Sequence, residues 1–311
     1  MKPHVVSIVG PTAVGKTELA VKLAQQFNGE VISGDSMQVY KSMDIGTAKV
    51  TSAEMEGIPH HMIDIKQPDE TFSVAEFQER TASLIDEITK RNRLPVIAGG
   101  TGLYIQAALF DFNFSNEKRD PEVIEKLEKE CEDQGIEELH TRLKAIDPVQ
   151  AGKIHPNNVR RVIRALEVYE TTGRTLSENH EAQTQEAPYH PHIIGLEMER
   201  GVLYERINKR VELMVKAGLE EEVRLLYEKG YEDCQSMKAI GYKEFIPYFK
   251  GEQSFDRTVE LLKRNSRRYA KRQLTYFKNK LDVQWYNVGS SKKQDTIEKI
   301  LRDLAGMLEE T

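Results

Sequence analysis

The chain has 311 residues, a formal net charge of −6 at pH 7, and 39% hydrophobic and 30% charged residues. This length allows about two domains with a sizeable core, and no apolar run approaches the ~20 residues that a membrane span requires. Two cysteines are too few for a zinc site built on thiolates, and the N-terminus has no secretory signal, so we expect a cytoplasmic protein without membrane contact.

The first third of the chain alternates short apolar runs with helical patterns. We expect strands at residues 5–9, 30–33, 60–65 and 94–98, and helices at 17–27 and 73–90. Strands that alternate with helices in this way predict βαβ units and an open parallel sheet with helices on both faces.

The pattern changes in the middle of the chain. Residues 116–189 are highly charged, poor in strand-like runs and interrupted by four prolines. Helical patterns occur there, and strands are expected again at 192–198 and 282–288. We therefore predict a P-loop NTPase-like α/β catalytic core at 1–114 and 190–311, interrupted by an all-helical insertion domain at 115–189.

The most specific motif directly follows the first strand and opens the first helix. It reads GPTAVGKT and fits the pattern GxxxxGK[ST]. In such a loop the backbone N–H groups point at phosphate oxygens, the lysine neutralises the terminal phosphates, and the last hydroxyl is placed to ligate Mg²⁺. We expect Thr17 to be the magnesium ligand and the phosphate site to comprise Gly10, Pro11, Thr12, Ala13, Val14, Gly15, Lys16 and Thr17. Kinases, NTPases and transferases that release diphosphate can all use this loop.

Two further segments are expected beside the phosphate site. The run SGDSMQVY follows the second strand, and AGGTGLY follows a later one. Ligands of open α/β sheets bind beyond the carboxyl ends of the strands, so Asp35 should lie within reach of an acceptor and could act as a general base. Thr101 brings a hydroxyl to the same edge, where its neighbouring glycines permit close backbone approach. An Asx-type turn at Asp35 and a plain strand-to-helix turn at Thr101 are the alternative interpretations.

Positive charge is concentrated near the C-terminus. Residues 257–280 contain nine Lys or Arg and one acid, Glu260. Charge segregated in this way within an acidic protein is typical of a surface that binds a polyanion. A solvated helix face is the alternative.

Taken together, these segments resemble the tRNA dimethylallyltransferase family, the isopentenyl-tRNA transferases. The matching runs are GPTAVGKTELA (10–20), ISGDSMQVYKSMDIGTAK (32–49), PHHMIDI (59–65), AGGTGLY (98–104), HPNNVRRVIRALEVYETTG (155–173), MKAIGYKE (237–244) and AKRQLTYFK (270–278). The resemblance implies transfer of a dimethylallyl group from dimethylallyl diphosphate to N6 of adenosine 37, in tRNAs that read codons starting with U. The P-loop would then hold the leaving diphosphate with Mg²⁺ as cofactor.

The resemblance also implies roles for individual residues. Asp35 would accept the proton of the adenine amine, and Ser36, Met37 and Gln38 would hold the base after it has flipped out of the anticodon loop. Thr101 would contact the reacting region from the opposite side, while Lys16 and Arg210 would contact the diphosphate. The tRNA anticodon stem-loop would be gripped by Arg160, Arg161, Val162, Ile163 and Arg164 of the insert and by Lys271, Arg272 and Gln273.

Three other functions remain open at this point. An adenylate isopentenyltransferase would act on free AMP, ADP or ATP, and is expected to lack much of the helical insert. A small-molecule P-loop kinase explains the chain up to Asp35 but gives the arginine-rich segments no role. An RNA-binding protein could use the P-loop only as a nucleotide sensor. With two scattered cysteines the chain lacks the C-terminal zinc finger of eukaryotic relatives, so it resembles the bacterial form, which we expect to be a monomer.

Overall fold

The computed structural model describes residues 2–110, 120–181, 187–289 and 293–309. The chain divides into two compact units, one formed by Met1–Phe110 with Ala187–Thr311 and the other by Asp111–Glu186. Position 115, where we expected the insert to begin, lies outside the described residues. No helix in the described ranges combines the length and apolar character needed to cross a membrane.

The first unit contains a six-stranded sheet in the order β3-β2-β4-β1-β5-β6, in which all neighbouring strands are parallel. The strands are β1 (His4–Val9), β2 (Gly29–Ser33), β3 (His60–His61), β4 (Leu94–Ala98), β5 (His190–Glu197) and β6 (Gln284–Asn287). The central strands β1 and β2 are almost entirely buried, as continuous apolar runs in a parallel sheet require. The predicted parallel α/β core is confirmed.

The strand expected at 60–65 is much shorter than predicted. It ends after His61, because Met62 and Asp64 adopt left-handed backbone conformations with φ of 63° and 55°. These conformations break the extended ladder, and the chain then makes an isolated bridge between Lys66 and Tyr40, both outside the strands of the sheet.

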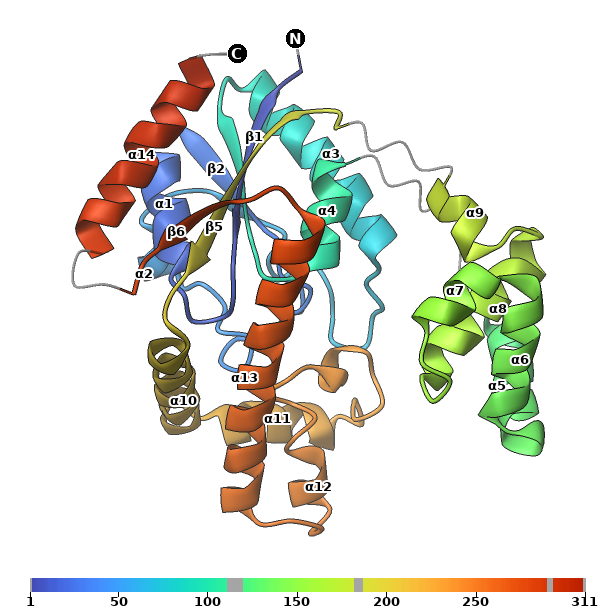
Figure 1. Cartoon of the computed structure of the whole chain (residues 1–311). Coiled ribbons are helices and arrows are strands. Elements are labelled where there is room, and N and C mark those ends of the chain that lie inside the picture. The colour runs from blue at the N-terminus through green and yellow to red at the C-terminus, as the bar shows by residue number, and fades with distance from the viewer. Residues whose placement is uncertain (1, 111–119, 182–186, 290–292, 310–311) are drawn as a thin grey trace. The chain divides into compact units, whose positions relative to one another are not determined.

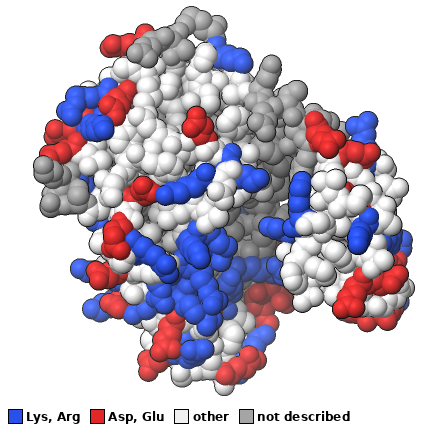
Figure 2. Space-filling view, in the orientation of Figure 1, with Lys and Arg blue, Asp and Glu red and all other residues white. Residues whose placement is uncertain are grey.

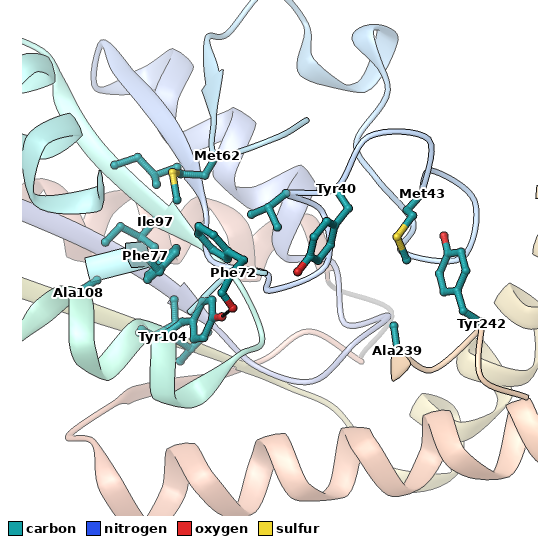
Figure 3. Close-up of a cluster of buried hydrophobic side chains, with 14 of the residues drawn as sticks. Tyr40, Met43, Met62, Phe72, Phe77, Ile97, Tyr104, Ala108, Ala239 and Tyr242 are labelled. Carbon is teal, nitrogen blue, oxygen red and sulfur yellow. Dashed lines mark hydrogen bonds between the residues drawn. The ribbon is translucent and has the colours of Figure 1, made fainter. Parts of the chain in front are cut away.

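Helices cover both faces of the sheet (Figure 1). The helices of this unit are α1 (Lys16–Gln26), α2 (Ser52–Met55), α3 (Val74–Lys90), α4 (Gly102–Leu109), α10 (Arg200–Lys216), α11 (Leu219–Glu228), α12 (Ile246–Phe249), α13 (Phe255–Lys280) and α14 (Lys293–Glu309). One hydrophobic core lies between the sheet, α3 and α4, and a second lies between the sheet, α1 and α14. Figure 3 shows part of the first core, where the rings of Phe77 and Tyr104 have centroids 4.7 Å apart.

The longest helix of the first unit, α13, begins where the Ser254 hydroxyl accepts the Arg257 N–H. Its buried positions include Leu262, Ala270, Gln273 and Phe277. These positions follow the helical repeat and form the face that packs toward α4 and α10. This packing brings α13 to the loops that follow the carboxyl ends of the strands.

The second unit is all-helical within residues 120–181. It contains α5 (Pro121–Gln134), α6 (Ile136–Ile146), α7 (Pro148–Lys153), α8 (Val159–Thr172) and α9 (Leu176–Glu181). It has a hydrophobic core of its own, with Leu127, Leu143 and Leu166 at its centre. Asp147 caps α7 and also accepts the backbone N–H and the hydroxyl of Ser177, so one carboxylate holds two helices together.

Candidate active site at the carboxyl edge of the sheet

The P-loop connects β1 to α1, as the sequence predicts. Gly10 has a φ of 143°, and a Cβ there would lie 2.5 Å from the carbonyl oxygen of Leu196. Gly15, the residue before α1, also has a positive φ of 107°. Both positions therefore require glycine. The first turn of an eleven-residue helix follows directly, and its free N–H groups favour an anion.

Two cations meet at this loop. Lys16 Nζ donates to the carbonyl oxygens of Gly10 (3.0 Å) and Pro11 (2.8 Å). Arg210, which α10 brings from 198 positions further along the chain, donates to Thr12 Oγ1 at 3.0 Å. The sequence-predicted pair of Lys16 and Arg210 is thus placed together.

The charges at the site favour a bound anion. Burial and, to a smaller extent, the neighbouring Arg210 lower the pKa of Lys16 to about 7, against the opposing effect of Asp35. Burial likewise lowers the pKa of Arg210, and Asp35 again opposes the shift. Two cations are partly desolvated here, and Asp35 and, for Arg210, Glu54 offset this only in part, so a bound anion would stabilise the charged form of both.

The Asp35 loop lies next to Thr101. Asp35 Oδ1 accepts the Met37 N–H at 2.8 Å, which makes an Asx-type turn. Thr101 Oγ1 accepts the Ser36 N–H at 3.2 Å and lies 3.4 Å from the Ser36 hydroxyl. Among the described residues, no hydrogen bond is made to Asp35 Oδ2. The turn and the proposed general base are therefore compatible, because each uses a different oxygen of the carboxylate.

Gln38 holds this loop in place from within. Its Oε1 accepts the Ser33 hydroxyl at 2.9 Å, and its Nε2 lies 3.2 Å from the Ala48 carbonyl. The following turn is held by Glu222 of α11, whose carboxylate accepts the N–H groups of Asp44, Ile45 and Gly46 and the Tyr242 hydroxyl. The motif at 237–244 thus supports the loop that carries the predicted base-binding residues.

The structure differs from our expectation for Gln273. We expected it to contact tRNA, but its side chain is only 5% exposed. Its Oε1 accepts the Thr12 N–H and its Nε2 donates to the Gly100 carbonyl, both at 2.9 Å. A Cβ at Gly100 would lie 2.1 Å from Gln273 Nε2, and one at Gly102 would lie 2.2 Å from the Tyr276 ring. These two glycines, in the second glycine turn (residues 98–104), therefore leave room for the side chains of α13.

Tyr269 is a further residue at the site that the sequence analysis did not single out. Its hydroxyl lies close to the side chains of Thr101 and Gln273. Burial, together with Asp35, raises the pKa of Tyr269 to about 12, so the phenol is neutral at ordinary pH. The sequence could have pointed to Tyr269 through its spacing from Gln273, because residues four apart lie on the same side of a helix.

The basic residues of α13 form an exposed patch with their neighbours on α10 (Figure 2). Several are neutralised, including Lys263 by Glu212 and Lys278 by Glu197. Other basic residues of α13 are exposed and form no ion pair within the described residues; these are Arg264, Arg268, Lys271, Arg272 and Lys280. Lys271 and Arg272, both predicted to bind tRNA, therefore face solvent.

The predicted tRNA-binding run on α8 separates into two groups. Arg160 and Arg161 are exposed, and their contact with RNA stays a prediction. Val162 and Ile163 are buried in the core of the insert, so our expectation of an RNA contact is corrected for these two. Arg164 pairs with the buried Glu167 at 3.1 Å, which gives this arginine a role in the fold of the insert.

A magnesium site beside the P-loop would have few protein ligands. Within the described ranges, no group of three or more His, Cys, Asp or Glu side chains is arranged to hold a metal ion. Thr17 is exposed at the start of α1. Mg²⁺ usually takes only one or two protein ligands and completes its shell with substrate phosphates and water. The hydroxyl of Thr17 beside the P-loop fits such an ion.

Comparison with known proteins identifies the family. Residues 38–280 match the family model described as IPP transferase. Full-length relatives called tRNA dimethylallyltransferase include those of Oceanobacillus iheyensis (59% identity, 100% of this chain and 99% of the relative) and Bacillus cytotoxicus (56%, 99% and 96%). Among solved structures, the tRNA isopentenylpyrophosphate transferase of Bacillus halodurans is 51% identical with a TM-score of 0.77, over 100% of this chain and 98% of its own. A eukaryotic dimethylallyltransferase described as acting on tRNA is 32% identical with a TM-score of 0.82, over 94% and 76%.

These matches confirm the resemblance drawn from the motifs, and they favour a tRNA-modifying prenyltransferase over an enzyme of free adenylates or a kinase. They extend over nearly the whole chain, including the arginine-rich segments that a kinase leaves without a role. The chain belongs to the IPP transferase family.

Proposed function

We propose that this enzyme transfers the dimethylallyl group of dimethylallyl diphosphate to N6 of adenosine 37, in tRNAs that read codons starting with U. The products would be N6-dimethylallyladenosine and diphosphate. The observation that carries this proposal is the meeting of an anion site, formed by the P-loop with Lys16 and Arg210, and a carboxylate, Asp35, at one edge of the sheet.

The donor half of the reaction needs stabilisation of a leaving diphosphate. In the proposed complex, Lys16, Arg210 and the N-terminus of α1 bind its oxygens and favour the charge that develops as the C–O bond breaks. Mg²⁺ held beside Thr17 would supply further stabilisation of that charge. Because this charge is larger in the transition state than in the bound ester, the same groups would lower the barrier to transfer.

The acceptor half needs a base for the adenine amine. As N6 bonds to C1 of the dimethylallyl group and the C1–O bond breaks, the amine loses one proton, which Asp35 Oδ2 would accept. Asp35 Oδ1 stays fixed by the Met37 N–H, so the carboxylate keeps its orientation during the transfer. A base within the anticodon loop must leave its stack to reach this edge, and we propose that it flips toward Asp35 and Thr101.

We further propose that exposed cations grip the anticodon stem-loop. Arg160 and Arg161 of the insert and Arg268 and Lys271 of α13 are exposed, and phosphate contacts of this kind dominate RNA affinity. One chain supplies every side chain invoked here, which supports a monomer. The tRNA substrate supports action in the cytoplasm.

The test is incorporation of labelled dimethylallyl groups with Mg²⁺ present. An anticodon stem-loop and free AMP are offered separately, and the nucleosides are identified by mass spectrometry. We expect N6-dimethylallyladenosine at the position next to the anticodon of the stem-loop, and no product from AMP. Prenylation of AMP alone would overturn the proposal, as would phosphoryl transfer from ATP without any prenyl transfer.

A further inference from the structure

Helix α13 contacts both halves of the site with two side chains one turn apart. Tyr269 and Gln273 are four residues apart, so they lie on the same side of the helix. Gln273 is buried, whereas Tyr269 is partly buried and has the guanidinium of the exposed Arg272 5.7 Å from its ring centroid. The Gln273 amide is therefore directed at the protein, and the Tyr269 ring lies between the buried face of the helix and its basic face.

Gln273 joins the donor loop to the second glycine turn. Its amide accepts from the Thr12 N–H and donates to the Gly100 carbonyl, with both distances 2.9 Å. The Thr12 hydroxyl also accepts a hydrogen bond from Arg210. The N–H of Thr12 is thus bound by protein, so Gln273 fixes the conformation of the P-loop at this residue.

Tyr269 continues the connection toward the acceptor loop. Its hydroxyl lies beside the side chains of Gln273 and Thr101, and Thr101 in turn accepts the Ser36 N–H at 3.2 Å. A path of neighbouring side chains therefore runs from the loop of the proposed base, through Tyr269 and Gln273, to the phosphate loop. It is hydrogen-bonded at its two ends, between Thr101 and Ser36 and between Gln273 and Thr12. Its outer contacts join residues 65 and 261 positions apart in the sequence.

We propose that Tyr269 and Gln273 are positioning residues that fix the separation and orientation of the donor and acceptor loops. The inference rests on the proposed function, and it assigns these residues an action through Thr12, Gly100 and Thr101 rather than on RNA. In-line transfer requires the attacking nitrogen and C1 of the donor to be aligned within a fraction of an ångström. A misplacement of about 1 Å can cost ~100-fold in rate.

The alternative is that Gln273 is part of the RNA-binding surface of α13 and contacts tRNA directly. The two roles predict different kinetics. Loss of an RNA contact raises the KM for tRNA and leaves kcat nearly unchanged, whereas loss of alignment lowers kcat and leaves both KM values nearly unchanged. Buried, fully hydrogen-bonded amides are typical of structural positions, which favours the second outcome.

The experiment compares Tyr269→Phe and Gln273→Met with Tyr276→Phe as the matched control. Tyr276 lies on the same helix and donates its hydroxyl to Gln106 at 2.5 Å, so its substitution removes an equivalent phenol outside the path. We measure kcat, both KM values, tRNA affinity by filter binding, and Tm. For the two path variants we expect kcat to fall about 10- to 100-fold, with KM and tRNA affinity within about threefold of wild type. The control should keep wild-type kcat.

The double variant separates a connected path from two independent contacts. If the path acts as a unit, Tyr269→Phe with Gln273→Met should be about as slow as the slower single variant. Wild-type kcat in both single variants would overturn the inference, and so would a rise in tRNA KM at unchanged kcat. If Gln273→Met lowers Tm below the assay temperature, Tyr269→Phe decides alone, because it removes one oxygen atom. Failure of the proposed function would be seen separately, as absence of transfer by wild type.

Discussion

Raising the pH above 7 is expected to weaken binding of dimethylallyl diphosphate, because Lys16 must be protonated to bind it. Burial and the neighbouring Arg210 lower the pKa of Lys16 to about 7 in the free protein. A bound diphosphate would favour the charged ammonium and raise that pKa again. Binding above pH 7 therefore includes uptake of a proton, and each unit of pH makes that uptake less favourable.

The magnitude follows from the pKa. With a value of about 7, about one Lys16 in ten is protonated at pH 8 and about one in a hundred at pH 9. Protonation then costs about 1.4 kcal/mol at pH 8 and about 2.7 kcal/mol at pH 9, so the Kd should rise about tenfold and then about a hundredfold. The rise stops where the pH reaches the pKa of Lys16 in the complex.

The assay is calorimetric titration with dimethylallyl diphosphate in the absence of RNA, so that no transfer occurs. Repeating it in two buffers with different heats of ionisation gives the number of protons taken up, which we expect to approach one at pH 8.5. Lys16→Arg is the control, because a guanidinium does not titrate in this range while the ionisation of the ligand is the same. Equal pH dependence in wild type and Lys16→Arg would refute the reasoning, since the titrating group would then belong to the ligand.

Other substitutions test other parts of the site. Asp35→Asn keeps the oxygen that caps the turn but removes the base, so turnover should fall ~10²–10⁴-fold with tRNA binding retained; loss of binding at normal turnover would contradict the assignment. Reversing the charge of Arg160 and Arg161 should raise the KM for tRNA and reduce its salt slope by about 0.7 per lost phosphate contact, and an unchanged slope would place the RNA elsewhere. Burial and neighbouring imidazoles lower the pKa values of His4 and His192 below 6.5. The folded state then binds fewer protons than the unfolded chain, so the free energy of unfolding is highest above pH 6.5 and falls as the pH drops through the folded pKa values. Urea titrations of wild type and His192→Gln measure this fall, which should be smaller in the variant.

The parts of the site that depend on local sequence were predictable. The P-loop needs fixed spacing between its glycines, lysine and hydroxyl, and the strand and helix beside it have clear periodicity. Asp35 and Thr101 were predictable from a general rule, because the carboxyl ends of parallel strands meet at one edge. The predicted insert likewise follows from a change in composition.

The parts that depend on long-range packing were not found in this way. Nothing near Met62 or Asp64 indicates a left-handed backbone, so the strand at 60–65 was predicted too long. Arg164 was grouped with its neighbours by charge, yet its partner Glu167 is buried in the insert. Removing Arg164 would leave that carboxylate without this cation inside the fold, a cost that charge counting does not reveal.

Helix α13 shows which additional signal the sequence held. Its charge indicates an RNA-binding surface, but its helical repeat separates two faces. Arg264, Arg268 and Lys271 recur at intervals of four and three on the exposed face, whereas Gln273 shares the opposite face with apolar residues such as Phe277. A polar side chain at a position that periodicity assigns to the core must find hydrogen bonds inside the protein. Periodicity therefore predicts that Gln273 binds protein groups, while the identity of those groups, Thr12 and Gly100, follows only from the fold.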